Sequence, residues 1–223
     1  MNIPIIVEKF NKLVANKNIV SIGSSNYDKE IISEFTNILK LENKQVFFVP
    51  TTASQAKQLH EKGEEIISLS EKEIDIALEF ASQVDSDNNF VKTETKSFIR
   101  DKMIGQSALN LVIVVDKTGV VDKITRDLYL EISTFAWQRT IINLQSYGNS
   151  RIVLDLNNNF VKTEIGHYLA RVTLDEHISL EDFEYSIRNI PGVLETGVFL
   201  GLADTIFVID SSDKNYLEIK SRK

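Results

Sequence analysis

Two carboxylates and a lysine mark residues 79–102, EFASQVDSDNNFVKTETKSFIRDK, as a place where chemistry could occur. Glu79 opens the stretch, Lys92 follows a spacer rich in Asp and Asn, and Asp101 precedes a second lysine. A positioned carboxylate can transfer protons, and a fixed cation can stabilise a developing negative charge. The same spacing is also typical of a solvated charged loop, because charged side chains are mostly exposed. The residues alone leave both interpretations open.

A second candidate is GSSNYD, residues 23–28, between an expected strand and an expected helix. The polar side chains that could reach a ligand there are Ser24, Ser25, Asn26 and Tyr27. Together with the free N–H groups of a helix start, they could cradle a phosphate. The alternative is that Ser25, Asn26 or Asp28 only caps the helix. Asp28 would repel an anion if it pointed inward.

The sequence contains no signature of a metal or a cofactor. There are no cysteines, and His60, His167 and His177 share no metal-ligand spacing. Neither a Ser/His/Asp motif, a Gly-x-Gly-x-x-Gly motif nor a Walker loop is found. A third polar segment, DKTGVVDK at residues 116–123, follows an apolar strand and offers only lysines and carboxylates. We therefore expect neither a metal nor a cofactor.

The bulk composition narrows the class of partner. Of the 223 residues, 43% are hydrophobic and 26% charged, which is ordinary for a globular protein. The net charge of −7 argues against nucleic acid or an anionic membrane as partner, because both reward a basic surface. The first residues, MNIPIIVEKFNKL, do not form a signal peptide, and no apolar run reaches membrane-spanning length. We expect a cytoplasmic protein whose ligand is a small molecule.

The elements that must position these side chains alternate between strand and helix. Strands are expected at 18–23, 45–50, 65–69, 74–78 and 109–116, and helices at 28–41, 54–63 and 96–108. The first of these helices places Ile31, Ile32, Phe35, Ile38 and Leu39 on one stripe. Such alternation indicates an α/β fold with a doubly wound, mostly parallel sheet. Ligands of these sheets bind at the carboxyl ends of the strands, where all three polar segments are expected.

The succession of expected strands and helices changes after residue 126. A strand at 128–133, a helix at 134–148 ended by Gly148, a hairpin at 151–165 and a strand at 167–175 are expected to follow. The next helix has a capping signature, with Ser179 at the N-cap and Asp182 three residues later. A strand at 193–200 then completes a small α+β domain. The tail strands at 204–210 and 216–220 are expected to rejoin the first sheet.

Several segments, in this order, give the chain a resemblance to the type A ribose-5-phosphate isomerase family. The segments that carry it are VPTTASQAKQLHEKG, IDIALEFASQVDSDNNFVK, SFIRDKMI, LVIVVDKTGVVDKI, RIVLDLN and LEDFEYSIRNIPGVLETGVFL. The resemblance spans nearly the whole chain. It implies a Rossmann-like, mostly parallel sheet with an inserted small α+β, ferredoxin-like domain. We place the first domain at residues 1–126 plus 200–223 and the inserted domain at 127–199.

The resemblance also implies an activity that needs no metal or cofactor. The family interconverts an aldose phosphate and a ketose phosphate: a carboxylate moves a proton between C1 and C2 through an enediolate, and a lysine stabilises the oxyanion. On this chain the base falls on Asp101, the lysine on Lys92 and the first sugar-orienting carboxylate on Glu79. The phosphate loop falls on Ser24, Ser25, Asn26 and Tyr27, and further substrate contacts fall on Ser82, Thr93 and Gly119.

Several of these positions depart from the family pattern. The family's Asp-Gly-Ala-Asp falls on residues 79–82, where Phe80 replaces a glycine and Ser82 replaces the second carboxylate. The family's Lys-Gly-Gly-Gly falls on 92–95, where the glycines are lost. The base is an aspartate instead of a glutamate, which withdraws it by about 1.5 Å, and a misplacement of about 1 Å can cost roughly a hundredfold in rate. A lysine near the phosphate falls on Gly119, and Lys117 or Lys123 could substitute for it.

These departures leave three hypotheses. The chain is a ribose-5-phosphate isomerase, or an impaired family member that binds a sugar phosphate or has a regulatory role, or an isomerase with an altered substrate. The expected partner is a small sugar phosphate, and under the second hypothesis it could be a different sugar phosphate or a protein partner. The resemblance further implies a homodimer or a homotetramer.

Overall fold

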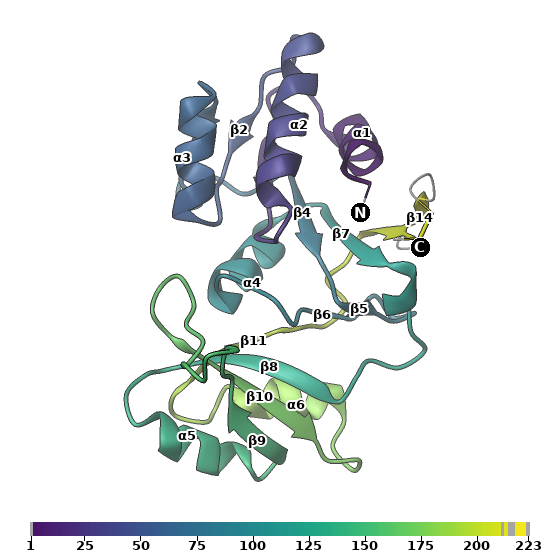
Figure 1. Cartoon of the computed structure of the whole chain (residues 1–223). Coiled ribbons are helices and arrows are strands. Elements are labelled where there is room, and N and C mark those ends of the chain that lie inside the picture. The colour runs from purple at the N-terminus through teal and green to yellow at the C-terminus, as the bar shows by residue number, and fades with distance from the viewer. Residues whose placement is uncertain (1, 211, 214–216, 222–223) are drawn as a thin grey trace.

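The computed structural model describes residues 2–210, 212–213 and 217–221. Within these residues, seven strands form a large sheet in the order β14-β13-β7-β4-β1-β2-β3 (Figure 1). Its strands are β1 (Ile19–Ile22), β2 (Phe47–Phe48), β3 (Glu65–Ile66), β4 (Ile76–Phe80), β7 (Leu111–Asp116), β13 (Thr205–Ile209) and β14 (Leu217–Ser221). All neighbours pair in parallel except β13 and β14. This confirms the doubly wound α/β fold and the return of the tail to the first sheet, although position 216 lies outside the described residues.

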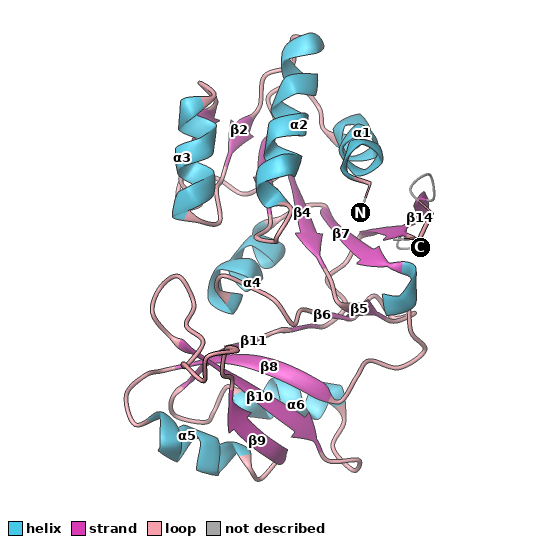
Figure 2. Ribbon diagram, in the orientation of Figure 1, coloured by secondary structure: helices cyan, strands magenta, loops and turns pink. Residues whose placement is uncertain are grey.

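Helices cover both faces of the large sheet (Figure 2). Helices α1 (Ile3–Leu13), α2 (Asp28–Leu41) and α3 (Ala53–Glu61) share one hydrophobic core with one face, whereas α4 (Phe98–Ser107) packs on the other. Strand β7 shows why both faces are apolar: Val112 and Val114 point to the first core, and Ile113 to the second. On α2 the predicted stripe is buried, with Ile38 partly buried at its edge. Among the described helices, none is long and apolar enough to cross a membrane.

A second, antiparallel sheet of four described strands, here called the small sheet, has the order β11-β8-β10-β9. Along the chain it reads β8 (Asp127–Ile132), α5 (Trp137–Leu144), β9 (Gly148–Ile152), β10 (Tyr168–Leu174), α6 (Leu180–Ile187) and β11 (Val193–Thr196). This is the βαββαβ succession of a ferredoxin-like unit, as expected. The predicted cap of α6 is present, because the Ser179 side chain accepts a hydrogen bond of 3.0 Å from the Asp182 N–H.

Three short described strands form a middle sheet, β12-β6-β5, between the other two (Figure 1). They are β5 (Gln83–Val84), β6 (Phe90–Val91) and β12 (Val198–Phe199). Gly197 joins β11 of the small sheet directly to β12. Its N–H donates to the Tyr129 carbonyl at 2.8 Å, and its carbonyl accepts from the Lys92 N–H at 2.8 Å. A single residue therefore links the small sheet to the backbone of Lys92.

Two expectations for the second half were wrong. The helix expected at 134–148 is shorter, and Gly148 begins β9 instead of ending a helix. Gly148 has a φ of 143°, and a Cβ there would approach the Thr173 carbonyl within 3.0 Å, so only glycine fits this start of the strand. The strand expected at 193–200 is broken at Gly197 into two strands of different sheets. The segment 151–165 does fold back at its Asn-rich turn, as expected: an antiparallel bridge joins Leu154 and Phe160, and the Val161 N–H donates to the Val153 carbonyl at 3.0 Å. Its beginning belongs to β9, which pairs with β10.

Candidate active site

The candidate site lies where strand order reverses, between β1 and β4 of the large sheet. In open α/β sheets this switch point forms the ligand crevice at the carboxyl ends of the strands. Gly23 follows β1, and its N–H donates to the Leu78 carbonyl at 2.7 Å, whereas Glu79 lies near the end of β4. A Cβ at Gly23 would come closer than 3.0 Å to the carboxylate of Glu79. Gly23 therefore makes room for the Glu79 side chain, a role that its sequence context did not reveal.

Lys92 joins the two predicted carboxylates. Its Nζ lies 2.6 Å from Glu79 Oε2 and 2.6 Å from Asp101 Oδ2. The exposed fractions of Glu79, Lys92 and Asp101 are 0%, 2% and 1%. Lys92 follows β6, Asp101 lies in the first half of α4, and Glu79 is on β4, so three separate elements supply this cluster. The three residues that the family resemblance selected converge on one buried point.

Thr95 is a fourth member that the sequence did not reveal. Its hydroxyl donates to Asp101 Oδ2 at 2.6 Å, and its Oγ1 accepts from the Ser97 N–H at 2.9 Å. Thr95 occupies one of the positions at which the family pattern has glycine. The side chain therefore supplies a specific hydrogen bond to the candidate base. The sequence signal was present only as a hydroxyl six residues before Asp101.

One cation between two buried carboxylates sets the electrostatics of the cluster. Burial raises the pKa of Glu79 to about 7, and the nearby Asp101 charge adds to this effect while Lys92 opposes it. Burial lowers the pKa of Lys92, but Asp101 and Glu79 outweigh it, so the net shift of the lysine pKa is upward. Glu79 therefore keeps its proton to a higher pH than an ordinary glutamate does.

Each carboxylate keeps one oxygen available. Glu79 Oε1 and Asp101 Oδ1 are buried and have no hydrogen-bond partner among the residues that the structure describes. A buried polar atom without a partner is costly, and such atoms concentrate at functional sites. Two buried acceptors that flank one ammonium group are suited to the hydroxyls of a polyhydroxylated ligand.

Two cavities adjoin the cluster. The first, called the Phe80 cavity, has a volume of about 270 Å³ and is lined by Ser24, Ser25, Asn26, Tyr27, Phe80, Ala81, Ser82, Thr93, Glu94, Val114, Asp116 and Ile209. The second, called the Lys96 cavity, has about 420 Å³ and shares residues 24–26 and 93–94 with the first. Its further lining includes Thr95, Lys96 and Tyr129. Glu79, Lys92 and Asp101 are not among the described lining residues of either cavity, so they lie behind these walls.

A contact between two loops separates the cavities. The Asn26 amide donates to Glu94 Oε2 at 3.1 Å, and the Lys96 N–H donates to Ser24 Oγ at 3.3 Å. Residues 93–96 are thereby held against residues 24–26. Because Thr95 binds Asp101, this segment also closes over the cluster.

Six of the seven predicted substrate-binding residues line the Phe80 cavity: Ser24, Ser25, Asn26, Tyr27, Ser82 and Thr93. The hydroxyls of Ser82 and Thr93 are 2.7 Å apart. Gly119 lies behind this wall, where a Cβ would come within 3.0 Å of the Ser82 carbonyl. Lys123, considered as a substitute cation, lines a different cavity beside Arg126 and His177. Besides Lys92 in the cluster, the structure places Lys96 in the lining of the cavity that residues 24–26 share.

The N-cap of the helix after β1 is none of the predicted residues, although Asp28 Oδ1 accepts from the Lys29 N–H in the first turn at 2.7 Å. Tyr27 is the N-cap of α2 and makes no capping hydrogen bond with its side chain. Ser25 Oγ instead accepts from the Tyr27 N–H at 3.0 Å. Asp28 Oδ2 accepts from the Gln55 amide at 3.1 Å, so its carboxylate points away from the two cavities. Asp28 thus does not line either cavity.

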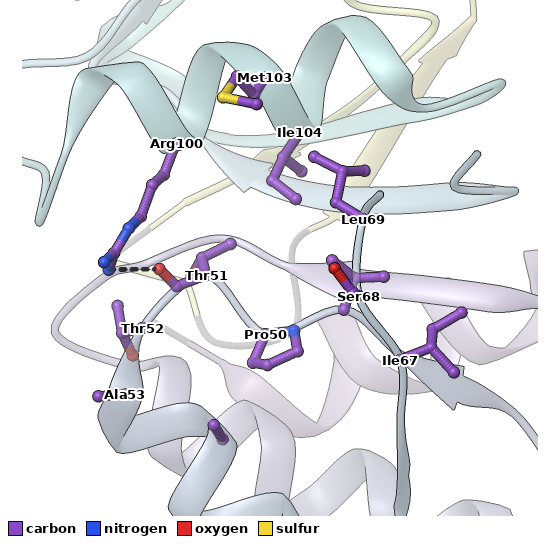
Figure 3. Close-up of a pocket in the computed structure, with 12 residues that line it drawn as sticks. Pro50, Thr51, Thr52, Ala53, Ile67, Ser68, Leu69, Arg100, Met103 and Ile104 are labelled. Atoms are coloured by element: carbon purple, nitrogen blue, oxygen red, sulfur yellow. Dashed lines mark hydrogen bonds between the residues drawn. The ribbon is translucent and has the colours of Figure 1, made fainter. Parts of the chain in front are cut away.

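Another cavity, of about 450 Å³, lies between α3 and α4 (Figure 3). Its walls are mostly apolar, and the Arg100 guanidinium donates to the Thr51 carbonyl at 3.1 Å across it. None of the predicted site residues lines this cavity. Among the described residues, no group of three or more His, Asp or Glu side chains is arranged to hold a metal ion.

The fold and the site define a Rossmann-like protein with a ferredoxin-like insertion and a carboxylate–lysine–carboxylate cluster at its switch point. The family model for ribose 5-phosphate isomerase A (phosphoriboisomerase A) matches residues 47–213. The chain belongs to this family.

Individual relatives agree with the family match. The chain is 32% identical over 203 residues to ribose-5-phosphate isomerase A of Prochlorococcus marinus, and these residues cover 87% of this chain and 86% of the relative. It is 26% identical over 213 residues to ribose-5-phosphate isomerase A 1 of Oceanobacillus iheyensis, with 95% of each chain covered. The structure of ribose 5-phosphate isomerase A from Methanocaldococcus jannaschii superposes with a TM-score of 0.86 at 22% identity, covering 99% of this chain and 98% of the other. This last likeness supports the fold.

Proposed function

We propose that this protein interconverts D-ribose 5-phosphate and D-ribulose 5-phosphate through an enediolate. Membership of the family supports the reaction, and the cluster around Lys92 supports the place where it occurs. The single observation that carries the assignment is that Lys92 Nζ lies 2.6 Å from both Glu79 and Asp101 while each carboxylate keeps a free, buried oxygen. The carboxylates that can transfer a proton and the lysine that can stabilise an oxyanion are thus in direct contact.

In this proposal Asp101 is the base. Its free Oδ1 takes a proton from one of the carbons C1 and C2 and returns it to the other, while Lys92 stabilises the charge that develops on the enediolate oxygen. Glu79 Oε1 accepts a hydrogen bond from a sugar hydroxyl and orients the open chain. Burial strengthens each of these electrostatic interactions, because little water competes with them.

The phosphate end is proposed to lie at residues 24–27, where serine hydroxyls and the Asn26 amide line both cavities. Lys96 lines the adjoining cavity and is proposed to supply the cation that position 119 lacks. Since the Asn26–Glu94 contact occupies this place, the phosphate must displace the Glu94 carboxylate. Displacement of residues 93–96 would at the same time expose the cluster to the sugar.

The assay compares conversion of ribose 5-phosphate by the wild-type protein with that by Lys92→Met and Asp101→Asn. Both substitutions should lower kcat by at least a hundredfold, since each removes a group that acts on the reacting atoms. Lys123→Met, at a lysine of a different cavity, is the matched control and should retain wild-type kcat. Turnover that survives both substitutions would refute the assignment of the site.

The impaired-member hypothesis makes a different prediction in the same experiment. A protein that only binds sugar phosphates would show no turnover above background. It would still be stabilised by ribose 5-phosphate in a thermal-shift measurement, and Lys96→Gln would weaken that stabilisation.

We further propose that residues 1–126 with 200–223 form one domain, residues 127–199 a second, and that the protein assembles as a homodimer or homotetramer. In this proposal a contact between copies buries large exposed side chains such as those of Phe135 and Tyr185, which are 85% and 83% exposed. Light scattering coupled to size-exclusion chromatography measures the assembly directly, and a monomer at micromolar concentration would contradict it. The cytoplasmic location stays a prediction.

A further inference from the structure

Glu131 is a fully buried carboxylate outside the Lys92 cluster. It lies on β8, which is an inner strand of the small sheet and pairs with both β10 and β11. A buried carboxylate is costly unless it is hydrogen-bonded on all sides. The two oxygens of Glu131 meet this requirement in two different parts of the fold.

One oxygen faces helix α4. Glu131 Oε2 accepts from the Ser97 hydroxyl at 3.0 Å and from the Ile99 N–H at 3.3 Å. Ser97 is the N-cap of α4, and Ile99 is in its first turn. The first N–H groups of a helix have no partner within the helix, and a negative charge there is favoured by the helix dipole. Glu131, on a strand of the small sheet, therefore caps the N-terminus of α4.

The other oxygen faces the segment between β9 and β10. Glu131 Oε1 accepts from the Thr163 hydroxyl at 2.9 Å, and it lies 2.8 Å from His167 Nδ1. The same segment makes a further contact, because the Glu164 N–H donates to the Lys96 carbonyl at 2.8 Å. The carboxylate of Glu131 thus bridges the small-sheet region and the start of α4.

The bridge continues to the candidate base through a short path. Ser97, which donates its hydroxyl to Glu131, also donates its N–H to Thr95 Oγ1, and the Thr95 hydroxyl donates to Asp101. Asp101 is itself only one turn beyond Ser97 on the same helix. A shift of the first turn of α4 would change both the helix that carries Asp101 and the hydrogen bond that orients it.

We propose that Glu131 is a positioning residue, through which the small sheet holds the first turn of α4 and thereby sets Asp101 against Lys92. The inference rests on the proposed role of Asp101 as base. Glu131 does not contact the proposed substrate cavities and acts only through α4. Its removal should therefore lower kcat while the KM for ribose 5-phosphate, set by the phosphate loop, changes little.

Two substitutions separate the hydrogen bonds of Glu131 from the space it fills. Glu131→Met keeps a side chain of similar length but removes the acceptor. Glu131→Gln keeps an oxygen that can accept from the Ile99 N–H, while its NH₂ group faces Thr163 and His167, both of which can become acceptors. We expect kcat to fall by about ten- to hundredfold in Glu131→Met, as for a displacement of about 1 Å, and to recover most of this loss in Glu131→Gln.

Asp127→Asn is the matched control. Asp127 lies on the same strand and makes its contacts with Arg171 and Thr173 on β10, away from α4. This substitution should lower the melting temperature without lowering kcat. Equal losses of kcat in Asp127→Asn and Glu131→Met would show a general structural role and overturn the proposal, as would a wild-type kcat in Glu131→Met.

Hydrogen exchange tests the proposal independently of turnover. The amide of Ile99 and its neighbours in the first turn of α4 should exchange at least tenfold faster in Glu131→Met than in the wild type or in Asp127→Asn. If the wild-type protein shows no isomerase activity, the proposed function fails and this measurement alone decides the positioning role: unchanged exchange overturns it. If Glu131→Met does not fold, Glu131→Asp, whose carboxylate is withdrawn by one methylene, replaces it with the same expected direction and the same overturning result.

Discussion

The carboxylate of Glu79 lies against Gly23, so closely that a Cβ on Gly23 would come within 3.0 Å of it. Gly23→Ala should therefore push Glu79 away from Lys92, lower kcat by about a hundredfold and reduce the free energy of unfolding by about 1–3 kcal/mol through overpacking. Steady-state kinetics and urea unfolding measure the two effects. Gly105→Ala is the control, because a Cβ in that helix meets ordinary contacts at 3.4 Å or more. Unchanged kcat in Gly23→Ala would contradict the predicted displacement of Glu79.

The raised pKa of Glu79 predicts how stability depends on pH. The folded state holds the proton up to about pH 7, whereas the unfolded chain releases it near the ordinary value of 4.5. The stabilising contribution is therefore fully present below pH 4.5 and is lost as pH rises to 7, by roughly 1–3 kcal/mol. Glu79→Gln, which cannot ionise, should gain stability relative to the wild type between pH 5 and pH 8. Urea unfolding at several pH values measures this difference, and a constant difference would count against the raised pKa.

Glu94 places a negative charge where the proposed function needs an anion to bind. The Glu94 carboxylate accepts a hydrogen bond from the Asn26 amide, and Glu94 lines both cavities. Two like charges about 4 Å apart repel by ~1 kcal/mol in water, so Glu94→Gln should lower the KM for ribose 5-phosphate by about fivefold. The inhibition constant of inorganic phosphate should fall by a similar factor, while kcat stays near the wild-type value. Glu73→Gln makes the same change of net charge at an exposed residue of the loop before β4, and should leave both constants unchanged. A KM that rises in Glu94→Gln would instead mean that Glu94 assists binding.

Lys102 holds α4 to the small sheet and its helix α6. Its Nζ lies 2.9 Å from Glu184 and 3.5 Å from Glu195, and it also donates to the Val198 carbonyl. Lys102→Met should lower the free energy of unfolding by about 3 kcal/mol, because it leaves the buried Glu184 and the half-buried Glu195 with Arg188 as their remaining cation.

The comparison for Lys102 is Lys12→Met, which breaks an exposed pair with Glu8 and should lower the free energy of unfolding much less than Lys102→Met does. Chemical unfolding of both variants at one pH measures the difference. Similar losses in the two variants would show that the buried pair contributes no more than the exposed one.

The sequence predicted best what depends on long, periodic patterns. The apolar stripe of α2 and the continuous apolar strand β7 are of this kind, and both are found as expected. The two-residue strands β5 and β6 carry no readable period, so the path of the chain between Glu79 and Lys92 could not be predicted. Helix α1 was also not assigned, although its N-cap Asn2 and the proline in its first turn are typical start signals.

The residues of the candidate site also divide into those that the sequence pointed to and those that it did not. The convergence of Glu79, Lys92 and Asp101 followed from the family resemblance, since no local pattern links residues that far apart. Thr95 and Glu131 act through contacts with α4 that appear only when the two halves of the chain fold together. Neither their residue types nor their spacing distinguishes them from ordinary polar positions. Tertiary contacts therefore account for most of what the sequence left unassigned.

Gly197 has a mechanical consequence for Lys92. Its N–H donates to the Tyr129 carbonyl in the small sheet, and its carbonyl accepts from the Lys92 N–H. A Cβ on Gly197 would come within 3.0 Å of both the Lys92 carbonyl and the Phe98 ring, so there is no room for a side chain at this position. A movement of the small sheet would therefore be transmitted through Gly197 to the backbone of Lys92. Because Glu131 and Lys102 also tie α4 to the small sheet, the same movement would reach the helix that carries Asp101.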